Sequence, residues 1–79
     1  MKELIEYIAK HLVDYPEKVI VEEIKSDDNT IVLTLKVEKN DIGKVIGKQG
    51  KHAMAMRLLL SAVGAKANCK ATLQIIDKD

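Results

Sequence analysis

The stretch Gly43-Lys44-Val45-Ile46-Gly47-Lys48-Gln49-Gly50-Lys51 decides how the chain folds, because it holds three of the four glycines and separates two apolar-periodic segments. Glycine has no Cβ, so a Gly-Lys-Gln-Gly turn allows the backbone to turn sharply and to come close to a ligand. The lysines place positive charge at the same point. This combination favours the sugar-phosphate chain of a nucleic acid over a neutral small molecule as the ligand.

The sequence on either side of this turn predicts two helices. A short helix is predicted around residues 44–46, with Asn40 or Asp41 as a candidate N-terminal cap. A longer helix is predicted from about residue 51 to 63, and Gly64 fits its C-terminal cap. The long helix starts directly after the glycine turn, so its free amides favour an anion there.

The rest of the sequence predicts a helix and a hairpin before the turn and one strand after it. Helical spacing of apolar residues predicts a first helix from Lys2 to about Val13, which Pro16 limits because the residue before a proline avoids helical angles. β-Branched residues predict a strand at 19–24. Alternation of apolar and polar residues predicts a second strand at 31–37 with one buried face, and a final strand is predicted at 71–76.

These elements predict an α+β fold with the order α-β-β-α-α-β in a single domain, residues 1–79. Two helices joined by a tight turn would cover one face of a three-stranded sheet and bury the core. A chain of 79 residues suffices for one small core but not for a deep enclosed pocket.

Charge is unevenly distributed along the chain, although the formal net charge is only +1. Residues 39–57 carry five basic side chains and one acid, Asp41, hence a local charge of +4. The other residues carry eight basic and eleven acidic side chains, hence −3. The local field determines where a polyanion docks, so a nucleic acid is a candidate ligand despite the near-neutral total. A solvated basic loop is the alternative.

Composition predicts a globular protein of the cytoplasm with no membrane partner. The chain is 47% hydrophobic and 32% charged, which is typical of a soluble fold and not of a disordered chain. No apolar run approaches the roughly 18 residues that a membrane span requires, and acids interrupt any signal-peptide pattern in residues 1–6. The single Cys69 cannot form an internal disulfide, which agrees with a reducing compartment.

The motifs of enzymes and cofactor sites are missing, so we expect a non-catalytic protein without metal or cofactor. A P-loop has the spacing Gly-x-x-x-x-Gly-Lys-Ser/Thr. Here three residues separate Gly43 from Gly47, and Gln49 replaces the hydroxyl residue. No His or Cys cluster has zinc spacing, and no nucleophile–base pair can be placed. The aromatic platforms of an RNA-recognition motif or OB-fold are also missing, since two tyrosines are the only aromatic residues.

Val45-Ile46-Gly47-Lys48-Gln49-Gly50 resembles the Ile-Gly-x-x-Gly signature of the KH (K-homology) RNA-binding domain. The predicted order resembles the type II, prokaryotic form of this fold, in which three helices cover one face of a three-stranded sheet. The length of the chain, and the loop running into Ala53, Ala55 and Arg57, resemble the small bacterial KH proteins of the KhpA family. The resemblance extends over essentially the whole chain.

The resemblance implies that the Gly-x-x-Gly loop clamps the backbone of about four nucleotides of single-stranded RNA, while the bases lie in an apolar groove. Gly47 and Gly50 would supply the backbone geometry. Lys48 and Gln49 would face phosphates, and Ile46 would line the groove, with residues 31–35 as the expected opposite wall. The candidate RNA-binding residues are Lys44, Ile46, Gly47, Lys48, Gln49, Gly50, Lys51 and Arg57.

Structural roles are the alternatives for several of these residues. Gly47 and Gly50 would also suit a plain corner between helices. Arg57, about one and a half turns into the helix, would suit either a second phosphate contact or a surface arginine that shields apolar neighbours. His52 follows the loop, and we expect an exposed helix histidine there rather than an RNA contact.

The helix predicted at residues 51–63 supports a second class of function, a protein–protein interaction module. With about 100° between residues, its apolar side chains fall on two nearly opposite faces: Ala53, Met56, Leu59, Leu60 and Val63 on one, and Met54, Leu58 and Ala62 on the other. One face would meet the sheet and the other a partner, unless the first helix covers it. The family resemblance implies a homodimer, or a heterodimer with a larger KH protein of the Jag/KhpB type.

Together these observations predict a non-catalytic protein that binds single-stranded RNA. The expected role is that of a small post-transcriptional regulator or RNA chaperone. Without aromatic stacking, binding by one domain should be weak, on the order of micromolar or worse, and strongly dependent on salt.

Overall fold

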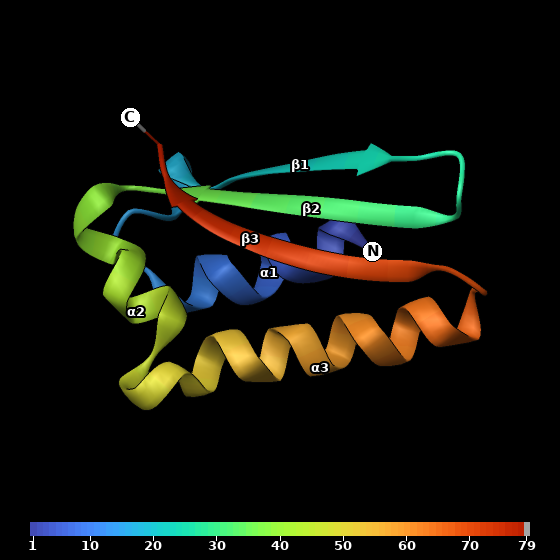
Figure 1. The fold of residues 1–79 in the computed structure, drawn as a ribbon. Helices are drawn as coiled ribbons and strands as arrows, with labels where there is room; N and C mark the ends of the chain where they lie inside the picture. The colour runs from blue at the N-terminus through green and yellow to red at the C-terminus, as the bar shows by residue number, and fades with distance from the viewer. Residues whose placement is uncertain (79) are drawn as a thin grey trace.

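The computed structural model of the protein describes residues 1–78, which form three α-helices and a three-stranded sheet (Figure 1). The helices are α1 (Lys2–Leu12), α2 (Ile42–Ile46) and α3 (Lys51–Lys66), and the strands are β1 (Ile20–Lys25), β2 (Thr30–Val37) and β3 (Lys70–Asp77). Single 3₁₀ turns occupy Pro16–Lys18, Lys39–Asp41 and Lys48–Gly50. The order α-β-β-α-α-β confirms the predicted α+β architecture.

Strand β2 lies in the centre of the sheet, between β1 and β3. It pairs antiparallel with β1, as a hairpin, and parallel with β3. Leu35 is opposite Val21 on one side and Ile75 on the other. A parallel pair cannot be joined by a tight turn, so α2 and α3 form the crossover connection between β2 and β3.

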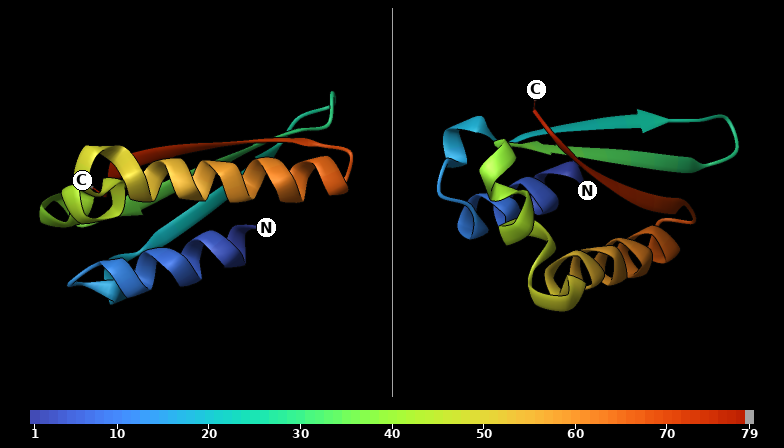
Figure 2. Two further views of the ribbon diagram at one scale, coloured as in Figure 1. Left: turned by 90° about the horizontal axis from the view of Figure 1, so that it is seen from below. Right: turned by 60° about the vertical axis from the view of Figure 1, so that its left-hand side comes forward.

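All three helices lie on one face of the sheet, and the core lies between these two layers (Figures 1 and 2). The predicted alternation in β2 is confirmed, since Leu33, Leu35 and Val37 have no exposed surface. Helix α1 contributes Ile5 and Ala9, which are four residues apart and therefore on the same helix face. The core residues are Ile5, Ala9, Val19, Val21, Leu33, Leu35, Val37, Val45, Met56, Leu60 and Leu73.

Helix α3 continues past the predicted end at residue 63, because Gly64 is not its C-terminal cap. The helix runs to Lys66, and Asn68 supplies the left-handed residue after it (φ 58°). Gly64 is buried inside the helix, where a Cβ would lie 2.7 Å from the carbonyl oxygen of Cys69. The glycine is therefore explained by the close approach of α3 to the start of β3 and not by helix termination.

The face of α3 that points away from the core is exposed. Met54 and Leu58 have 65% and 72% of their surface exposed, so the alternative that the first helix covers them is wrong. None of the helices in residues 1–78 is both long enough and apolar enough to cross a membrane.

Candidate nucleic-acid interface

The corner between α2 and α3, residues 47–50, has a backbone shape that favours glycine. Gly47 (φ 79°, ψ 168°), Gln49 (φ 57°) and Gly50 (φ 74°) all have positive φ. The amide of Gly47 donates to the carbonyl of Gly43 (2.9 Å) at the end of α2. Helix α3 then begins at Lys51, as predicted, and no side chain caps its N-terminus. The positive end of the helix dipole therefore lies at the corner, where it favours an anion.

The side chains of the corner are directed to solvent. Lys48, Gln49 and Lys51 are exposed, and among residues 1–78 neither lysine forms an ion pair. A Cβ at Gly50 would meet no atom within 4 Å, so open space lies beside its backbone. Ile46, at the end of α2, is 37% exposed. The corner thus combines two unpaired cations, an uncapped helix N-terminus and an accessible backbone.

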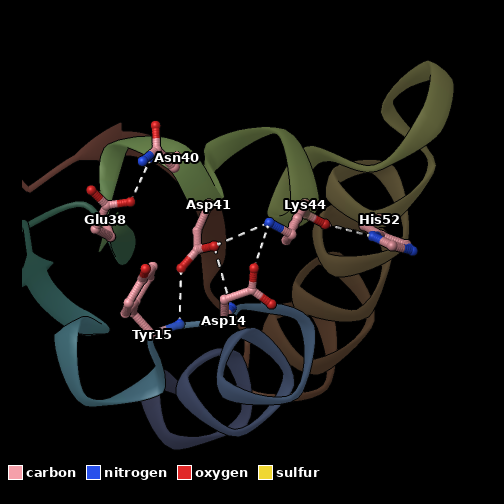
Figure 3. Close-up of polar contacts among 7 residues, drawn as sticks. All are labelled: Asp14, Tyr15, Glu38, Asn40, Asp41, Lys44 and His52. Atoms are coloured by element: carbon pink, nitrogen blue, oxygen red, sulfur yellow. Dashed lines mark hydrogen bonds and ion pairs between the residues drawn. The ribbon is translucent and has the colours of Figure 1, made fainter.

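Two of the predicted basic contacts, Lys44 and Arg57, are engaged within the protein. The ammonium of Lys44 lies 2.8 Å from a carboxylate oxygen of Asp14 and 3.5 Å from one of Asp41 (Figure 3). The hydrogen bond that Lys44 donates to Asp14, and the negative charge of both acids, raise the pKa of Lys44 above its ordinary value. Arg57 donates to the carbonyl oxygen of Leu73 in β3 at 3.5 Å. The cations that are free to meet a ligand at the corner are therefore Lys48 and Lys51.

The expected opposite wall of a groove, residues 31–35, is not available. These residues belong to the central strand β2, and Leu33 and Leu35 are fully buried. The strand beside α3 is β3, as the contacts of Gly64 and Arg57 with its residues indicate. The groove wall was predicted wrongly because the prediction considered only the hairpin of β1 and β2. The third strand, β3, pairs parallel with β2 and places β2 in the middle of the sheet.

Asp41 has a different role from the predicted helix cap. It precedes α2, but its side chain makes no capping hydrogen bond to the backbone of that helix, and Asn40 lies in the preceding 3₁₀ turn. The Asp41 carboxylate is fully buried and accepts hydrogen bonds from the amides of Asp14 (3.2 Å) and Tyr15 (3.1 Å). It therefore ties the chain after α1 to the start of α2 (Figure 3). Asp41 is the single acid within residues 39–57, and this isolation is the one feature of the sequence that could have indicated a structural role.

His52 contacts the corner from within the protein, which sequence reasoning did not predict. Its Nδ1 lies 2.8 Å from the carbonyl oxygen of Lys44 (Figure 3). Its ring also lies against Gly47, where an added Cβ would be 2.6 Å from the ring carbon Cγ. The histidine is exposed, as expected, but one side of its ring packs on the corner.

Two cavities lie at the other end of α3, away from the corner. One, of about 400 Å³, is bounded by the start of α1, the hairpin end of β1 and β2, and the turn before β3, and it includes Met1, Asn29 and Cys69. The other, of about 460 Å³, shares Asn29 and Cys69 with it. Within residues 1–78, no three His, Cys, Asp or Glu side chains are placed to hold a metal ion.

The mixed sheet, the one-sided helix layer and the Ile-Gly-Lys-Gln-Gly corner together define a KH domain of type II. The chain matches the family described as "KhpA/KhpB, KH domain" over residues 2–75. It therefore belongs to this family, as the sequence predicted.

Relatives named RNA-binding protein KhpA share the whole length of the chain. The protein from Clostridium perfringens is 51% identical over 76 residues, covering 96% of this chain and 100% of its own. The protein from Chlamydia trachomatis is 46% identical over 78 residues, with 99% of each chain covered. The protein from Listeria monocytogenes is 47% identical over 77 residues, covering 98% of this chain and 100% of its own. These names denote binding proteins and not enzymes, in agreement with the predicted non-catalytic protein.

One solved structure shares the fold at low sequence identity. It is the crystal structure of Era in complex with MgGDPNP and nucleotides 1506–1542 of 16S ribosomal RNA. The TM-score is 0.53 at 19% identity, and the match covers 96% of this chain and 29% of the Era chain. At this identity the likeness shows the fold alone.

Proposed function

We propose that the protein binds single-stranded RNA without catalysis and holds the RNA backbone at residues 47–50. The observation that carries the proposal is the exposed corner, in which Lys48 and Lys51 have no ion pair with any residue from 1 to 78 and α3 starts without a side-chain cap. Phosphate oxygens accept hydrogen bonds, and amides and ammonium groups donate them. The names of the full-length relatives support RNA as the polyanion.

The proposal assigns different roles to the candidate residues. Lys48 and Lys51 contact phosphates as mobile point charges, and the Gly50 backbone allows a phosphate to approach closely. Ile46 lies at the edge of the surface that the bases contact. Because charge dominates this interface, affinity should fall steeply with salt, by a slope of about 0.7 in log–log units for each phosphate neutralised on a single strand.

The double variant Lys48→Asp with Gln49→Asp tests the proposal. It reverses the charge of the corner at two exposed positions, so we expect it to abolish binding of a short single-stranded RNA in a filter-binding assay. The stability change should stay within about 0.5 kcal/mol per site, because both side chains face solvent. A thermal melt measures this independently.

A matched control comes from the other end of α3. Lys66 and Asn68 are exposed, and Asn68 has positive φ, as Gln49 does. The double variant Lys66→Asp with Asn68→Asp therefore makes a similar change of charge on similar backbone. It should keep most of the affinity. Binding of wild-type strength by the Lys48→Asp, Gln49→Asp protein would contradict the proposal.

The cellular role included in the proposal is that of a small post-transcriptional regulator or RNA chaperone in the cytoplasm. The small size of the single domain and its backbone-directed corner support binding to many RNAs over reading of one sequence. Crosslinking in the source cell, followed by sequencing of the bound RNA, tests this. Recovery of no RNA from that experiment would count against it.

A second candidate function, self-association through α3, is favoured by the exposure of Met54 and Leu58. Both side chains lie on the helix face opposite the buried Ala53, Met56 and Leu60. A homodimer would join two weak RNA-binding corners and raise the apparent affinity without new contacts. The family description names KhpA and KhpB together, which supports, as an alternative form of this proposal, a heterodimer with a larger KH protein of the KhpB type.

Light scattering of Leu58→Glu tests the second candidate. A charge in the middle of the apolar face should halve the mass of a homodimer, whereas Lys66→Glu, beyond that face, should leave it unchanged. An unchanged mass of the Leu58→Glu protein would remove the homodimer. Mixing with a KhpB-type protein then decides whether the same face forms a heterodimer.

A further inference from the structure

We propose that His52 is a positioning residue that fixes the shape of the corner before RNA binds, through its hydrogen bond to Lys44 and its contact with Gly47. This inference deepens the proposed function and rests on it for its effect on RNA affinity. It concerns a residue that the sequence predicted to be an ordinary exposed histidine.

The end of α2 leaves a backbone acceptor without its helical partner. In a continuing helix, the carbonyl of Lys44 would accept from the amide of Lys48. Gly47 (φ 79°, ψ 168°) turns the chain out of the helix before that bond can form. The last carbonyls of a helix need other partners. His52 provides one, because its Nδ1 lies 2.8 Å from the Lys44 carbonyl oxygen.

The partner of His52 determines which ring nitrogen carries the proton. A carbonyl oxygen only accepts, so Nδ1 must be the donor. The structure therefore assigns the Nδ1–H form to the neutral ring. Nε2 is directed away from Lys44 (Figure 3). This assignment follows from the acceptor alone, and it can be measured directly.

The ring of His52 also restricts the first glycine of the corner. A Cβ at Gly47 would be 2.6 Å from Cγ and 2.8 Å from Nδ1 of His52. The imidazole therefore fills the space that a side chain at Gly47 would occupy. It contacts Gly47 on one side while binding the end of α2, which leaves the corner little freedom to rotate.

Lys44 extends this connection to the far side of α2. Its ammonium binds Asp14 and Asp41, while its carbonyl binds His52 (Figure 3). Asp41 in turn holds the amides of Asp14 and Tyr15. A continuous set of contacts thus joins the chain after α1 to the first turn of α3. The corner between them is supported from both sides.

His52 should raise the apparent affinity for RNA by holding the corner in its binding shape before RNA arrives. If the corner has the binding shape for only a fraction of the time, the apparent affinity falls by that fraction. Loss of one hydrogen bond worth about 1 kcal/mol corresponds to a factor of roughly five. The phosphate contacts themselves are unchanged. The salt dependence of binding should therefore stay the same while the affinity falls.

Two variants separate the hydrogen bond from the bulk of the side chain. Asn and Leu both branch at Cγ, as His does, but only Asn carries an N–H group at the place of Nδ1. The probe is a fluorescent single-stranded RNA of about ten nucleotides, which is longer than the four or so that one domain contacts. His52→Leu should bind it roughly fivefold more weakly than the wild-type protein does. His52→Asn should bind within about twofold of wild type, because the donor is restored. Both should keep the wild-type salt slope.

Nitrogen NMR of the wild-type ring provides the test that does not depend on RNA. It should show the Nδ1–H tautomer whenever the ring is neutral. An Nε2–H ring would overturn the proposal, as would equal RNA affinity of the His52→Leu and wild-type proteins. A shallower salt slope in His52→Leu would also overturn it, because it would make His52 a phosphate contact. Failure of the wild-type protein to bind RNA would instead remove the proposed function, and the tautomer would still decide the positioning role.

Discussion

The two glycines of the corner, Gly47 and Gly50, have different surroundings, although only two residues separate them. Gly47 is enclosed, since His52 lies where its side chain would be, and its backbone has angles that almost only glycine adopts. Gly50 is open, with no atom within 4 Å of an added Cβ, and its left-handed angles are accessible to Asn and, at some cost, to other residues. The first glycine therefore serves the fold, while the second leaves room for a ligand.

A Gly-x-x-Gly signature therefore contains two kinds of requirement, one at each glycine. The requirement for glycine at position 47 is fully explained by contacts and backbone angles within the protein. The left-handed backbone angles explain only part of the requirement for glycine at position 50. The open space beside Gly50 would in addition allow another molecule to approach the backbone closely. Variants at the two positions should therefore separate stability from affinity.

Gly47→Ala should have the largest effect and should act on stability. The substitution combines forbidden backbone angles with a contact 2.6 Å from the His52 ring. We expect a loss of roughly 3 kcal/mol of unfolding free energy, near the upper limit for one strained position. Urea denaturation measures it. A loss as small as that of Gly50→Ala would show that the two glycines are equivalent after all.

Gly50→Ala should destabilise the protein less than Gly47→Ala does. Relative to this loss of stability, its loss of RNA affinity should be larger. Left-handed angles cost an L-residue about 1 kcal/mol, and no clash is added. The new Cβ should weaken RNA binding about tenfold, because it lies where the phosphate would approach. Gly50→Asn separates backbone strain from obstruction of the ligand, since Asn tolerates left-handed angles but still adds a side chain. If Gly50→Asn binds RNA as well as wild type, the open side of the corner is not a ligand surface.

Lys44→Met should have a smaller effect, mainly on stability. It removes the ion pairs that join α2 to Asp14 and Asp41. Because these acids raise the pKa of Lys44 above the ordinary 10.5, the contribution is complete below that value and is lost as pH rises through the raised pKa. Wild type and variant should therefore approach the same urea midpoint at high pH.

The salt slope of RNA binding distinguishes Lys44 from a corner lysine. Lys44→Met should leave the slope unchanged, whereas Lys48→Met should make it shallower by about 0.7. Filter binding at several salt concentrations measures both. An equally shallow slope for both variants would place Lys44 among the phosphate contacts, and a wild-type slope for both would remove Lys48 from them.

Gln49→Gly should have the smallest effect. Gln49 has positive φ (57°) without being glycine, so replacing it relieves local strain. The greater freedom of glycine in the unfolded chain offsets much of this gain. We expect a change in unfolding free energy of only a few tenths of a kcal/mol, measured by thermal melting. A destabilisation above about 1 kcal/mol would indicate that the Gln49 side chain supports the corner.

The sequence predicted the elements well because their signals are local. Alternation at residues 31–37 identified β2, and the strand predicted at 19–24 is shifted by one residue from Ile20–Lys25. The start of α3 at Lys51 followed from the glycine turn. Family resemblance then provided the topology, which local patterns do not contain.

The failures share a different cause, since each involves residues that meet only in the folded chain. Gly64 looks like a cap until the turn before β3 packs against it, where an added Cβ would lie 2.7 Å from the carbonyl oxygen of Cys69. Asp41 looks like a cap until the chain after α1 brings two amides to its carboxylate. His52 looks like a surface residue until α2 ends beside it. The RNA-binding residues themselves stay predictions, now centred on Lys48, Gln49, Gly50 and Lys51.

The parallel pairing of β2 with β3 has a consequence for the order of folding. Thr34 and Gln74, which face each other across this pair, are separated by 40 residues. Closing so long a loop is slow, because chain entropy is lost before the contacts form. The corner lies inside that loop, and α3, which forms one side of the corner, gains its contacts with β3 only when the last strand docks. A nascent or C-terminally shortened chain should therefore have the glycine signature without the surface it encodes.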